Sequence, residues 1–262
     1  MIHPSAVIED GAEIGENVRI GPFSHVGPNV RIGDDSELLG QCSVQGNTVL
    51  GARTRIFPFA SVGSEPQDLK FAGEDVSLMV GDDCTIREGV TMNPGTGHGG
   101  VKTVVGNKCL FLANSHVAHD CQVGDGVILS NNVMLAGHCT IGDHVIFGGG
   151  SGVHQFSRIG NNAFIGGLAG VEGDVIPFGM VIGNRGNLAG LNIIGMKRGG
   201  MARETIHAVR NAYKVLFDGQ NPVQENAKNL MADATDAQVI KMLDFVLAAK
   251  DRALCTPGVK AG

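Results

Sequence analysis

The sequence lacks the features that identify several common classes of protein. None of its apolar runs reaches the length that a bilayer span requires, and the N-terminus shows no signal peptide. Asp and Glu number 26 against 20 Lys and Arg, so the net charge of −6 provides no bulk attraction to nucleic acid. The 40 glycines lack the three-residue period of collagen. These absences predict a soluble, cytoplasmic protein that has no membrane span and binds no nucleic acid.

A zinc or redox motif built on cysteine is also missing. The six cysteines include no C-x-x-C pair, which is the spacing typical of such sites. Five of them occupy positions that a repeat in the sequence reserves for small residues, and this favours buried, structural thiols. These five are Cys42, Cys84, Cys109, Cys121 and Cys139.

The chain does contain an aliphatic residue, or a phenylalanine or methionine in its place, at every sixth position. The series covers residues 2–62 and 80–92, and a second register covers residues 105–171. Neither the 3.6-residue period of a helix nor the 2-residue period of a strand gives this pattern. Three six-residue sides make a coil of 18 residues, and stacked coils bury one another's apolar residues. The repeat predicts a mainly β protein, a hexapeptide parallel β-helix.

Two interruptions and one transition divide the chain. Residues from about 63 to 79 contain proline and charge, and residues from about 93 to 103 are rich in glycine. Both segments are expected to leave the β-helix as loops, and insertions in a solenoid often gather on its binding face. Beyond residue 201 the apolar residues follow helical spacing. We therefore expect a β-helix over residues 1–186 and a C-terminal α-helical domain over residues 187–262.

Histidines cluster in the second register, where five of the nine fall within 39 residues. Because residues 18 apart stack, His119, Gly137 and Gln155 share one column, while Asp120 and His138 share the next. An aspartate can hold one ring nitrogen of a histidine base, and a glycine N–H one coil away can donate to a developing oxyanion. The columns predict a base-catalysed site at this position.

Several segments together resemble the UDP-N-acetylglucosamine O-acyltransferase family, which catalyses the first step of lipid A synthesis. They are Gln-Asp-Leu-Lys (67–70), Ala-His-Asp-Cys (118–121), Ala-Gly-His (136–138), Val-His-Gln-Phe (153–156) and Arg-Asn-Ala-Tyr-Lys (210–214). The resemblance implies a left-handed β-helix, which is an exception to the right-handed crossover rule. It also implies a homotrimer with active sites between subunits. The implied reaction moves a 3-hydroxyacyl group from acyl carrier protein to the sugar 3-hydroxyl, without metal or cofactor.

The resemblance also implies roles for individual residues. His119 is expected to be the general base, Asp120 its support, and the Gly137 N–H the oxyanion donor. Gly167 matches a position that limits acyl length, and a glycine there favours a longer chain. The residues expected to bind the substrates are Asp68, Lys70, His116, His138, His154, Gln155, Asn192 and Arg198.

Some positions depart from the family pattern and leave alternatives open. Ile194 stands where many relatives have glutamate, Gly199 where they have a second arginine, and Asn93 begins a segment where they have His-Arg. These changes are compatible with a different acceptor, a 3-amino sugar nucleotide acylated on nitrogen. A further alternative is a zinc β-helix hydratase of the γ-carbonic-anhydrase type, since neutral histidines would suit zinc.

A basic helix face provides an independent argument for the carrier partner. Acyl carrier proteins are acidic, and Arg203, Arg210 and Lys214 are spaced 7 and 4 residues apart, hence on one face of a helix. Together with Lys197 and Arg198 they place five basic residues within 18 positions. A local basic patch steers an acidic partner even on an acidic protein, so this face is the expected docking site.

Overall fold

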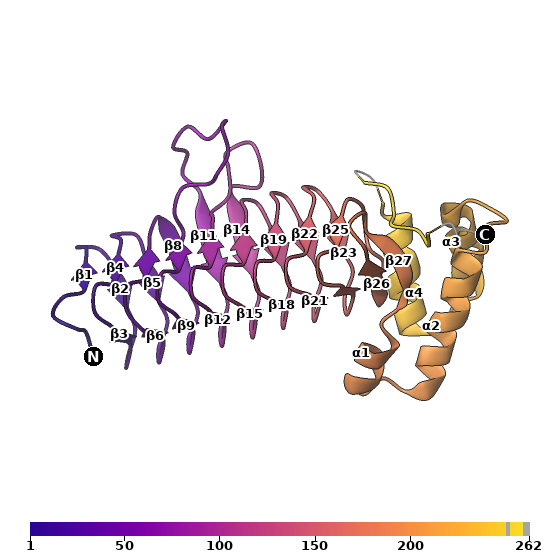
Figure 1. Ribbon diagram of the computed structural model, residues 1–262, viewed down its shortest axis with the longest axis horizontal. Coiled ribbons are helices and arrows are strands. Elements are labelled where there is room, and N and C mark those ends of the chain that lie inside the picture. The colour runs from indigo at the N-terminus through magenta and orange to yellow at the C-terminus, as the bar shows by residue number, and fades with distance from the viewer. Residues whose placement is uncertain (250–251, 259–262) are drawn as a thin grey trace.

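The computed structural model describes residues 1–249 and 252–258, which form a long prism with helices at one end (Figure 1). Three sheets make the sides of the prism. Sheet A contains β3 (Arg19–Ile20), β6 (Glu37–Leu38), β9 (Arg55–Ile56), β12 (Thr85–Ile86), β15 (Leu110–Phe111), β18 (Ile128–Leu129), β21 (Ile146–Phe147), β24 (Phe164–Ile165), β26 (Gly179–Ile182) and β27 (Asn187–Leu191). Sheet B contains β1 (Val7–Ile8), β4 (His25–Val26), β7 (Ser43–Val44), β10 (Ser61–Val62), β13 (Thr91–Met92), β16 (His116–Val117), β19 (Met134–Leu135), β22 (Gly152–Val153) and β25 (Gly170–Val171). Sheet C contains β2 (Glu13–Ile14), β5 (Arg31–Ile32), β8 (Asn47–Leu50), β11 (Ser77–Val80), β14 (Lys102–Val105), β17 (Gln122–Val123), β20 (Thr140–Ile141) and β23 (Arg158–Ile159).

The chain visits sheets B, C and A in turn, so each circuit is one coil and the strands of each side pair in parallel. Val7 pairs with His25, and His116 pairs with Met134, in both cases 18 residues apart. The sixth-position residues point inward, and Phe111, Leu129 and others of the series are fully buried. The parallel β-helix and its 18-residue coil, predicted from the repeat, are therefore confirmed, and the cysteines are buried and free.

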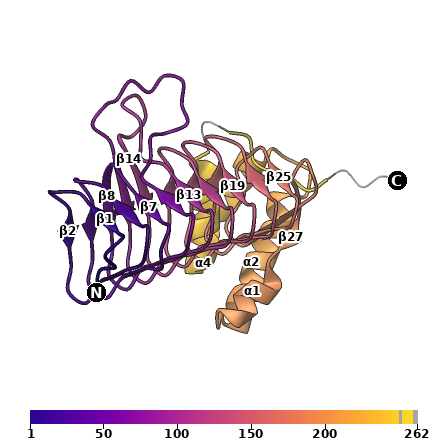
Figure 2. The same ribbon diagram turned by 60° about the vertical axis from the view of Figure 1, so that its left-hand side comes forward.

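The corners of the prism are named here by the sheets they join. The insertion between β10 and β11 covers residues 63–76, and that between β13 and β14 covers residues 93–101. Both replace a turn from sheet B to sheet C, so both leave the prism at the B/C corner. Figures 1 and 2 show the two loops beside one another, and Figure 1 shows them on the side away from the strands of sheet A. The insertions thus mark one corner of the molecule.

In the part of the chain that the structure describes, four helices follow the last strands. Sheet A ends with an antiparallel pair, β26 and β27, so sheet structure continues past the boundary expected at residue 186. The helices are α1 (Ile193–Arg198), α2 (Arg203–Leu216), α3 (Val223–Asp233) and α4 (Ala237–Leu247). On α2 the predicted apolar stripe is buried at Ile206, Val209 and Leu216. No helix among the described residues has the length and apolar content that a membrane crossing demands.

Candidate functional site

Three successive coils place His119, Gly137 and Gln155 above one another at the B/C corner, as the 18-residue arithmetic predicts. The imidazole of His119 lies directly over the backbone of Gly137. A Cβ atom built on Gly137 would lie 2.7 Å from His119 Nε2 and 2.5 Å from its Cε1. Only a glycine leaves room for the ring here, so the two residues form one structural unit.

Asp120 holds the inner nitrogen of this imidazole. Its backbone adopts a left-handed conformation (φ 60°), and its carboxylate Oδ2 lies 2.9 Å from His119 Nδ1. The same carboxylate accepts hydrogen bonds from Thr96 N (3.0 Å), Thr96 Oγ1 (2.6 Å) and Gly100 N (2.8 Å). Burial raises the pKa of Asp120, but these hydrogen bonds outweigh it and leave the pKa below its ordinary value. An ionised Asp120 fixes the proton of His119 on Nδ1, so Nε2 carries the lone pair that a general base needs.

The glycine-rich loop that supplies these donors contributes residues that the sequence analysis missed. Thr96 is fully buried, and a Cβ on Gly99 would overlap the Asp120 carboxylate. His98, from the same loop, brings Nε2 to 3.1 Å from Asp68 Oδ2. The only sequence signal was the position of the loop, which replaces the corner one coil before His119.

The backbone N–H of Gly137 is the second feature of chemical interest. The neighbouring amide of His138 donates to His119 O, at 3.0 Å, but the Gly137 N–H has no hydrogen-bond partner among the described residues. Gly137 is buried, and buried backbone N–H groups are almost always paired. An unpaired donor beside a base is therefore available to an oxygen atom of a ligand.

A hollow of about 510 Å³ opens in front of this unit between the first loop and the corner. Asp68 Oδ2 lies 4.0 Å from His119 Nε2, and a hydrogen bond from Lys70 N, together with the nearby histidines, lowers the pKa of Asp68. His138 stacks on Phe156 with ring centroids 4.4 Å apart, and its burial lowers its pKa. The hollow is lined by Gln67, Asp68, Leu69, Lys70, His98, His119, His138, Gln155 and Phe156.

A second hollow, of about 620 Å³, lies on sheet B next to the same corner and shares Gln67 with the first. It contains the predicted residues His116 and His154. The Nδ1 atom of His116 is 2.7 Å from Thr91 Oγ1, and burial, reinforced by nearby His119, lowers the pKa of His116. The sheet B hollow also exposes the edges of Met134, Gly152 and Gly170, so its floor is apolar.

Asn192 and Arg198 do not join this group. They line a third hollow of about 630 Å³ between α1 and sheet A, together with the departing residues Ile194 and Gly199. Sheet A is the side of the prism opposite the B/C corner. The side chain of Asn192 caps α1 by accepting a hydrogen bond from Gly195 N, at 2.9 Å. One chain therefore cannot present its own Arg198 and its own His119 to a single small substrate.

Two other groups of residues lie apart from the corner. Gly167 lies at the A/B corner, where a Cβ would meet Gly149 O at 3.4 Å. The predicted docking residues are exposed along α2 and at the end of α1. These are Lys197, Arg198, Arg203, Arg210 and Lys214.

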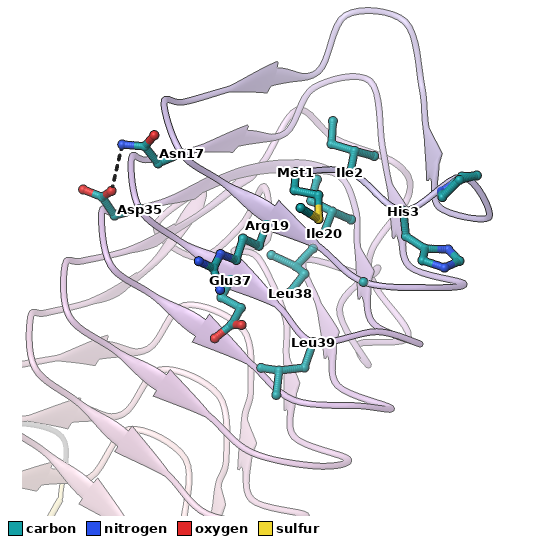
Figure 3. Close-up of a pocket in the computed structure, with 12 residues that line it drawn as sticks. Met1, Ile2, His3, Asn17, Arg19, Ile20, Asp35, Glu37, Leu38 and Leu39 are labelled. Atoms are coloured by element: carbon teal, nitrogen blue, oxygen red, sulfur yellow. Dashed lines mark hydrogen bonds between the residues drawn. The ribbon is translucent and has the colours of Figure 1, made fainter.

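A further hollow, of about 1040 Å³, lies at the open N-terminal end of the prism (Figure 3). It is bordered by Met1, Ile20 and Leu38, with Arg19 and Glu37 on its rim. None of the predicted site residues lies there. It is the uncovered end of the stack of coils, and it contains no histidine cluster.

A metal could in principle use His119, Asp120 and His138, whose ligand atoms lie within 4.8 Å of one another. The carboxylate of Asp120, however, already accepts three hydrogen bonds from the glycine-rich loop and lies next to His119 Nδ1. It would have to leave those donors unpaired in order to bind an ion, which is costly for buried groups. The donor set fits a histidine base better than a metal centre.

Comparison with known proteins extends along almost the whole chain. A family model described as UDP N-acetylglucosamine O-acyltransferase, domain 2, matches residues 174–255, and a bacterial transferase hexapeptide model matches residues 1–28, 11–46 and 102–137. An acyl-(acyl-carrier-protein)–UDP-N-acetylglucosamine O-acyltransferase of Rhizobium johnstonii is 58% identical over 98% of this chain and 94% of its own length. The chain belongs to the UDP-N-acetylglucosamine O-acyltransferase family. The enzyme of the same name from Brucella ovis is 48% identical over 99% of this chain and 94% of its own length.

Solved structures of the family agree with the fold. UDP-N-acetylglucosamine acyltransferase from Campylobacter jejuni is 36% identical, with a TM-score of 0.93 over 98% of this chain and 99% of that one. A second UDP-N-acetylglucosamine acyltransferase is 39% identical, with a TM-score of 0.96 over 99% of this chain and 100% of that one. The left-handed β-helix with a helical C-terminal part is thereby confirmed, and so is the prediction that this chain is an acyltransferase.

Proposed function

We propose that the chain transfers a 3-hydroxyacyl group from acyl carrier protein to the 3-hydroxyl of UDP-N-acetylglucosamine, the first step of lipid A synthesis. The observation that carries the proposal is the unit at the B/C corner, an imidazole held by Asp120 that lies over the free N–H of Gly137. A base and an oxyanion donor side by side are what acyl transfer from a thioester requires. The names of the relatives supply the two substrates.

The mechanism follows from the positions of these groups. His119 Nε2 takes the proton of the acceptor hydroxyl, and the oxygen attacks the thioester carbonyl. The Gly137 N–H donates to the oxyanion that forms, and the intermediate then breaks its C–S bond. The departing thiolate takes the proton back from His119, so the products are an ester and a free thiol. A positioned base is worth about 10²–10⁴-fold in rate and one oxyanion donor about 10²–10³-fold.

The substrates are proposed to lie along the corner. Asp68, Lys70, His138 and Gln155 border the hollow in front of His119, which suits a polar sugar. His116 and His154 border the sheet B hollow, whose apolar floor suits an acyl chain. Gly167 is proposed to leave room for a longer chain at the A/B corner.

A homotrimer would complete this site. Arg198 and the α1 hollow lie on the side opposite His119, and an arginine there suits a nucleotide diphosphate. The proposed ring of three prisms is one in which the sheet A side of each chain faces the B/C corner of the next. The proposed site therefore takes His119 from one subunit and Arg198 from its neighbour.

Mixed oligomers test this arrangement directly. His119→Ala and Arg198→Ala chains should each be inactive alone, because every site in the ring lacks one group. Oligomers assembled from both chains contain some sites with both groups intact, so activity should return on mixing after denaturation and refolding. The control is each variant alone, denatured and refolded in the same way and at the same total concentration. A mixture that stays inactive, although it assembles, would contradict a shared site.

The exposed face of α2 is proposed to dock acyl carrier protein. Reversing Arg210 and Lys214 to glutamate should raise the Michaelis constant for the carrier about tenfold at low salt, a ratio that corresponds to 1.4 kcal/mol. The effect should shrink as salt screens the charges. The matched control reverses Lys228 and Lys241, two exposed lysines on α3 and α4, which gives the same net charge. If the two pairs of charge reversals raised the Michaelis constant equally, the proposal that α2 docks the carrier would be wrong.

The products identify the acceptor. Purified protein is incubated with carrier thioesters of mixed chain lengths and with UDP-N-acetylglucosamine or its 3-amino analogue, and the products are analysed by mass spectrometry. We expect an O-acylated sugar nucleotide, and none with His119→Ala. If a product formed only from the amino analogue, the acceptor group would be an amine and not the proposed hydroxyl. Carbon dioxide hydration with stoichiometric zinc would support the hydratase alternative.

A further inference from the structure

After α4 the chain does not end in the helical part but returns to the β-helix. Leu254 forms a parallel bridge with Asp174, whose backbone N–H donates to Ala253 O and whose carbonyl accepts from Cys255 N, both at 2.8 Å. Farther along, Thr256 O accepts from Leu188 N at 3.0 Å. This C-terminal strap, residues 252–258, therefore crosses the B/C corner one coil beyond Gln155.

The first residue of the strap reaches the candidate site. Arg252 Nη2 lies 2.7 Å from His154 Nδ1, and Arg252 Nε donates to Gln155 O at 3.0 Å. Both partners belong to the group expected to bind the substrates. No repeat or motif pointed to this arginine, which comes from the opposite end of the chain.

The contact determines the tautomer of His154. A guanidinium has only donors and remains charged, so His154 Nδ1 must offer its lone pair and the ring proton must be on Nε2. A competing contact exists, because Nδ1 is also 3.3 Å from Gln155 O, and that hydrogen bond would need a proton on Nδ1. The contact to Gln155 O is the longer one, and the carbonyl already accepts from Arg252. Arg252 therefore excludes the alternative tautomer.

We propose that Arg252 is a positioning residue that fixes His154 in the neutral Nε2–H form and so gives the sheet B hollow a hydrogen-bond donor. Nδ1 is occupied, so Nε2 is the nitrogen left for a ligand in the hollow that His154 lines. The ligand group is an acceptor oxygen of the acyl donor. This inference rests on the proposed function of the sheet B hollow as the acyl site. Without Arg252, the ring can turn its proton to Nδ1 and present an acceptor instead.

The first test reads the tautomer without any activity measurement. Histidine labelled with ¹⁵N is incorporated, and the two ring nitrogens of His154 are assigned in long-range proton–nitrogen spectra, with His154→Phe identifying the signals. We expect a protonated Nε2 in the unmodified protein and a shift toward protonated Nδ1 in Arg252→Met. Arg31→Met, at an exposed arginine paired with Glu13 in an early coil, is the control. An unchanged His154 spectrum in Arg252→Met overturns the proposal.

The second test asks whether Arg252 acts through His154. Arg252→Met should raise the Michaelis constant for the acyl donor about tenfold, because a change of that size corresponds to the loss of about one hydrogen bond to the donor. The turnover number should change less, and Arg252→Lys should recover part of the loss. In a His154→Phe background, Arg252→Met should have no further effect. An equal penalty in both backgrounds means a structural role for the strap and refutes the proposal.

The two tests separate this inference from the proposed function. If His119→Ala retains activity, the proposed chemistry fails, yet the tautomer of His154 and its dependence on Arg252 are still measured. If the chemistry holds and the spectrum of Arg252→Met is unchanged, only the inference about the strap fails. Melting temperatures of all variants detect a strap that merely stabilises the fold.

Discussion

The C/A corner of the prism repeats one hydrogen bond from coil to coil, whereas the corresponding donor at the B/C corner has no partner among the described residues. At the C/A corner, Asp34 Oδ1 accepts from Glu16 N at 2.7 Å, and Asp125 Oδ1 accepts from Asn107 N at 2.6 Å. At the B/C corner the middle residue is Gly137, and no side chain in the described part of the chain accepts a hydrogen bond from its N–H. Each aspartate or asparagine at this position of the C/A corner therefore accepts from a backbone amide of the coil before it. We call this series of hydrogen bonds the C/A ladder.

The backbone of the two corners is nevertheless the same. The last corner residue is left-handed at Asp35 (φ 57°) and Asp83 (φ 58°), and equally at Asp120 (φ 60°) and His138 (φ 62°). What differs is the side chains and the two loop insertions, one of which supplies Thr96 to Asp120. The reactive corner thus differs from the C/A corner in two respects: no side chain of the described residues accepts from its middle amide, and an imidazole lies over its glycine.

Removing the imidazole should have the largest effect. His119→Ala should lower turnover about 10²–10⁴-fold, because a positioned base contributes that much. Its melting temperature should stay near that of the unmodified protein, since the Asp120 carboxylate keeps its three hydrogen bonds from the glycine-rich loop. His3→Ala, at an exposed histidine of the first coil, is the control. If His119→Ala retained more than a tenth of normal turnover, the B/C corner would not be distinguished by a catalytic base.

Adding one methyl group at the B/C corner should have the next largest effect. Gly137→Ala places a Cβ where the ring of His119 lies, and a displacement of about 1 Å in a catalytic group costs about 10²-fold in rate. At the C/A corner the equivalent position already carries a side chain at Ala52. Steady-state kinetics of Gly137→Ala and of the control Ala52→Gly decide the point. Normal turnover in Gly137→Ala would show that the ring has no fixed place.

Cutting the ladder at the C/A corner should have the smallest effect and leave catalysis intact. Asp125→Ala removes the acceptor for Asn107 N and should lower the free energy of unfolding by about 1 kcal/mol. Asp125→Asn keeps an acceptor oxygen and should lose less. Thermal melts and turnover of both variants are compared with the unmodified protein. If Asp125→Ala lost turnover while its melting temperature stayed unchanged, the C/A corner would take part in catalysis, contrary to this comparison.

The sequence predicted the columns of the site because position in a coil is arithmetic. His119 over Gly137, and Asp120 beside His138, follow from the 18-residue register alone. The contact between His119 and Asp120 does not follow from the register, because adjacent residues on a strand point to opposite faces. The left-handed backbone at Asp120 turns its carboxylate back toward the ring, and that is a property of the corner rather than of the repeat.

Features outside the repeat were not predictable in the same way. Thr96 and His98 lie in an insertion without period, so nothing in the sequence specifies that its amides converge on Asp120. Asn192 and Arg198 lie past the last regular coil, and their position across the prism from His119 appears only in three dimensions. Arg252 reaches His154 through a return of the chain that no local pattern indicates.

The glycine-rich loop has a consequence for engineering. It leaves the prism after β13 and rejoins it at β14, while the strands on either side stay in register, with Thr91 opposite His116 and Val104 opposite Gln122. Segments of other lengths are therefore graftable at this point without re-registering the scaffold. A library that randomises residues 97 and 98, while keeping Gly99 and the Thr96 and Gly100 donors that surround the Asp120 carboxylate, would vary the entrance to the hollow without displacing the partner of His119. The loop is therefore a place at which acceptor choice can be redesigned.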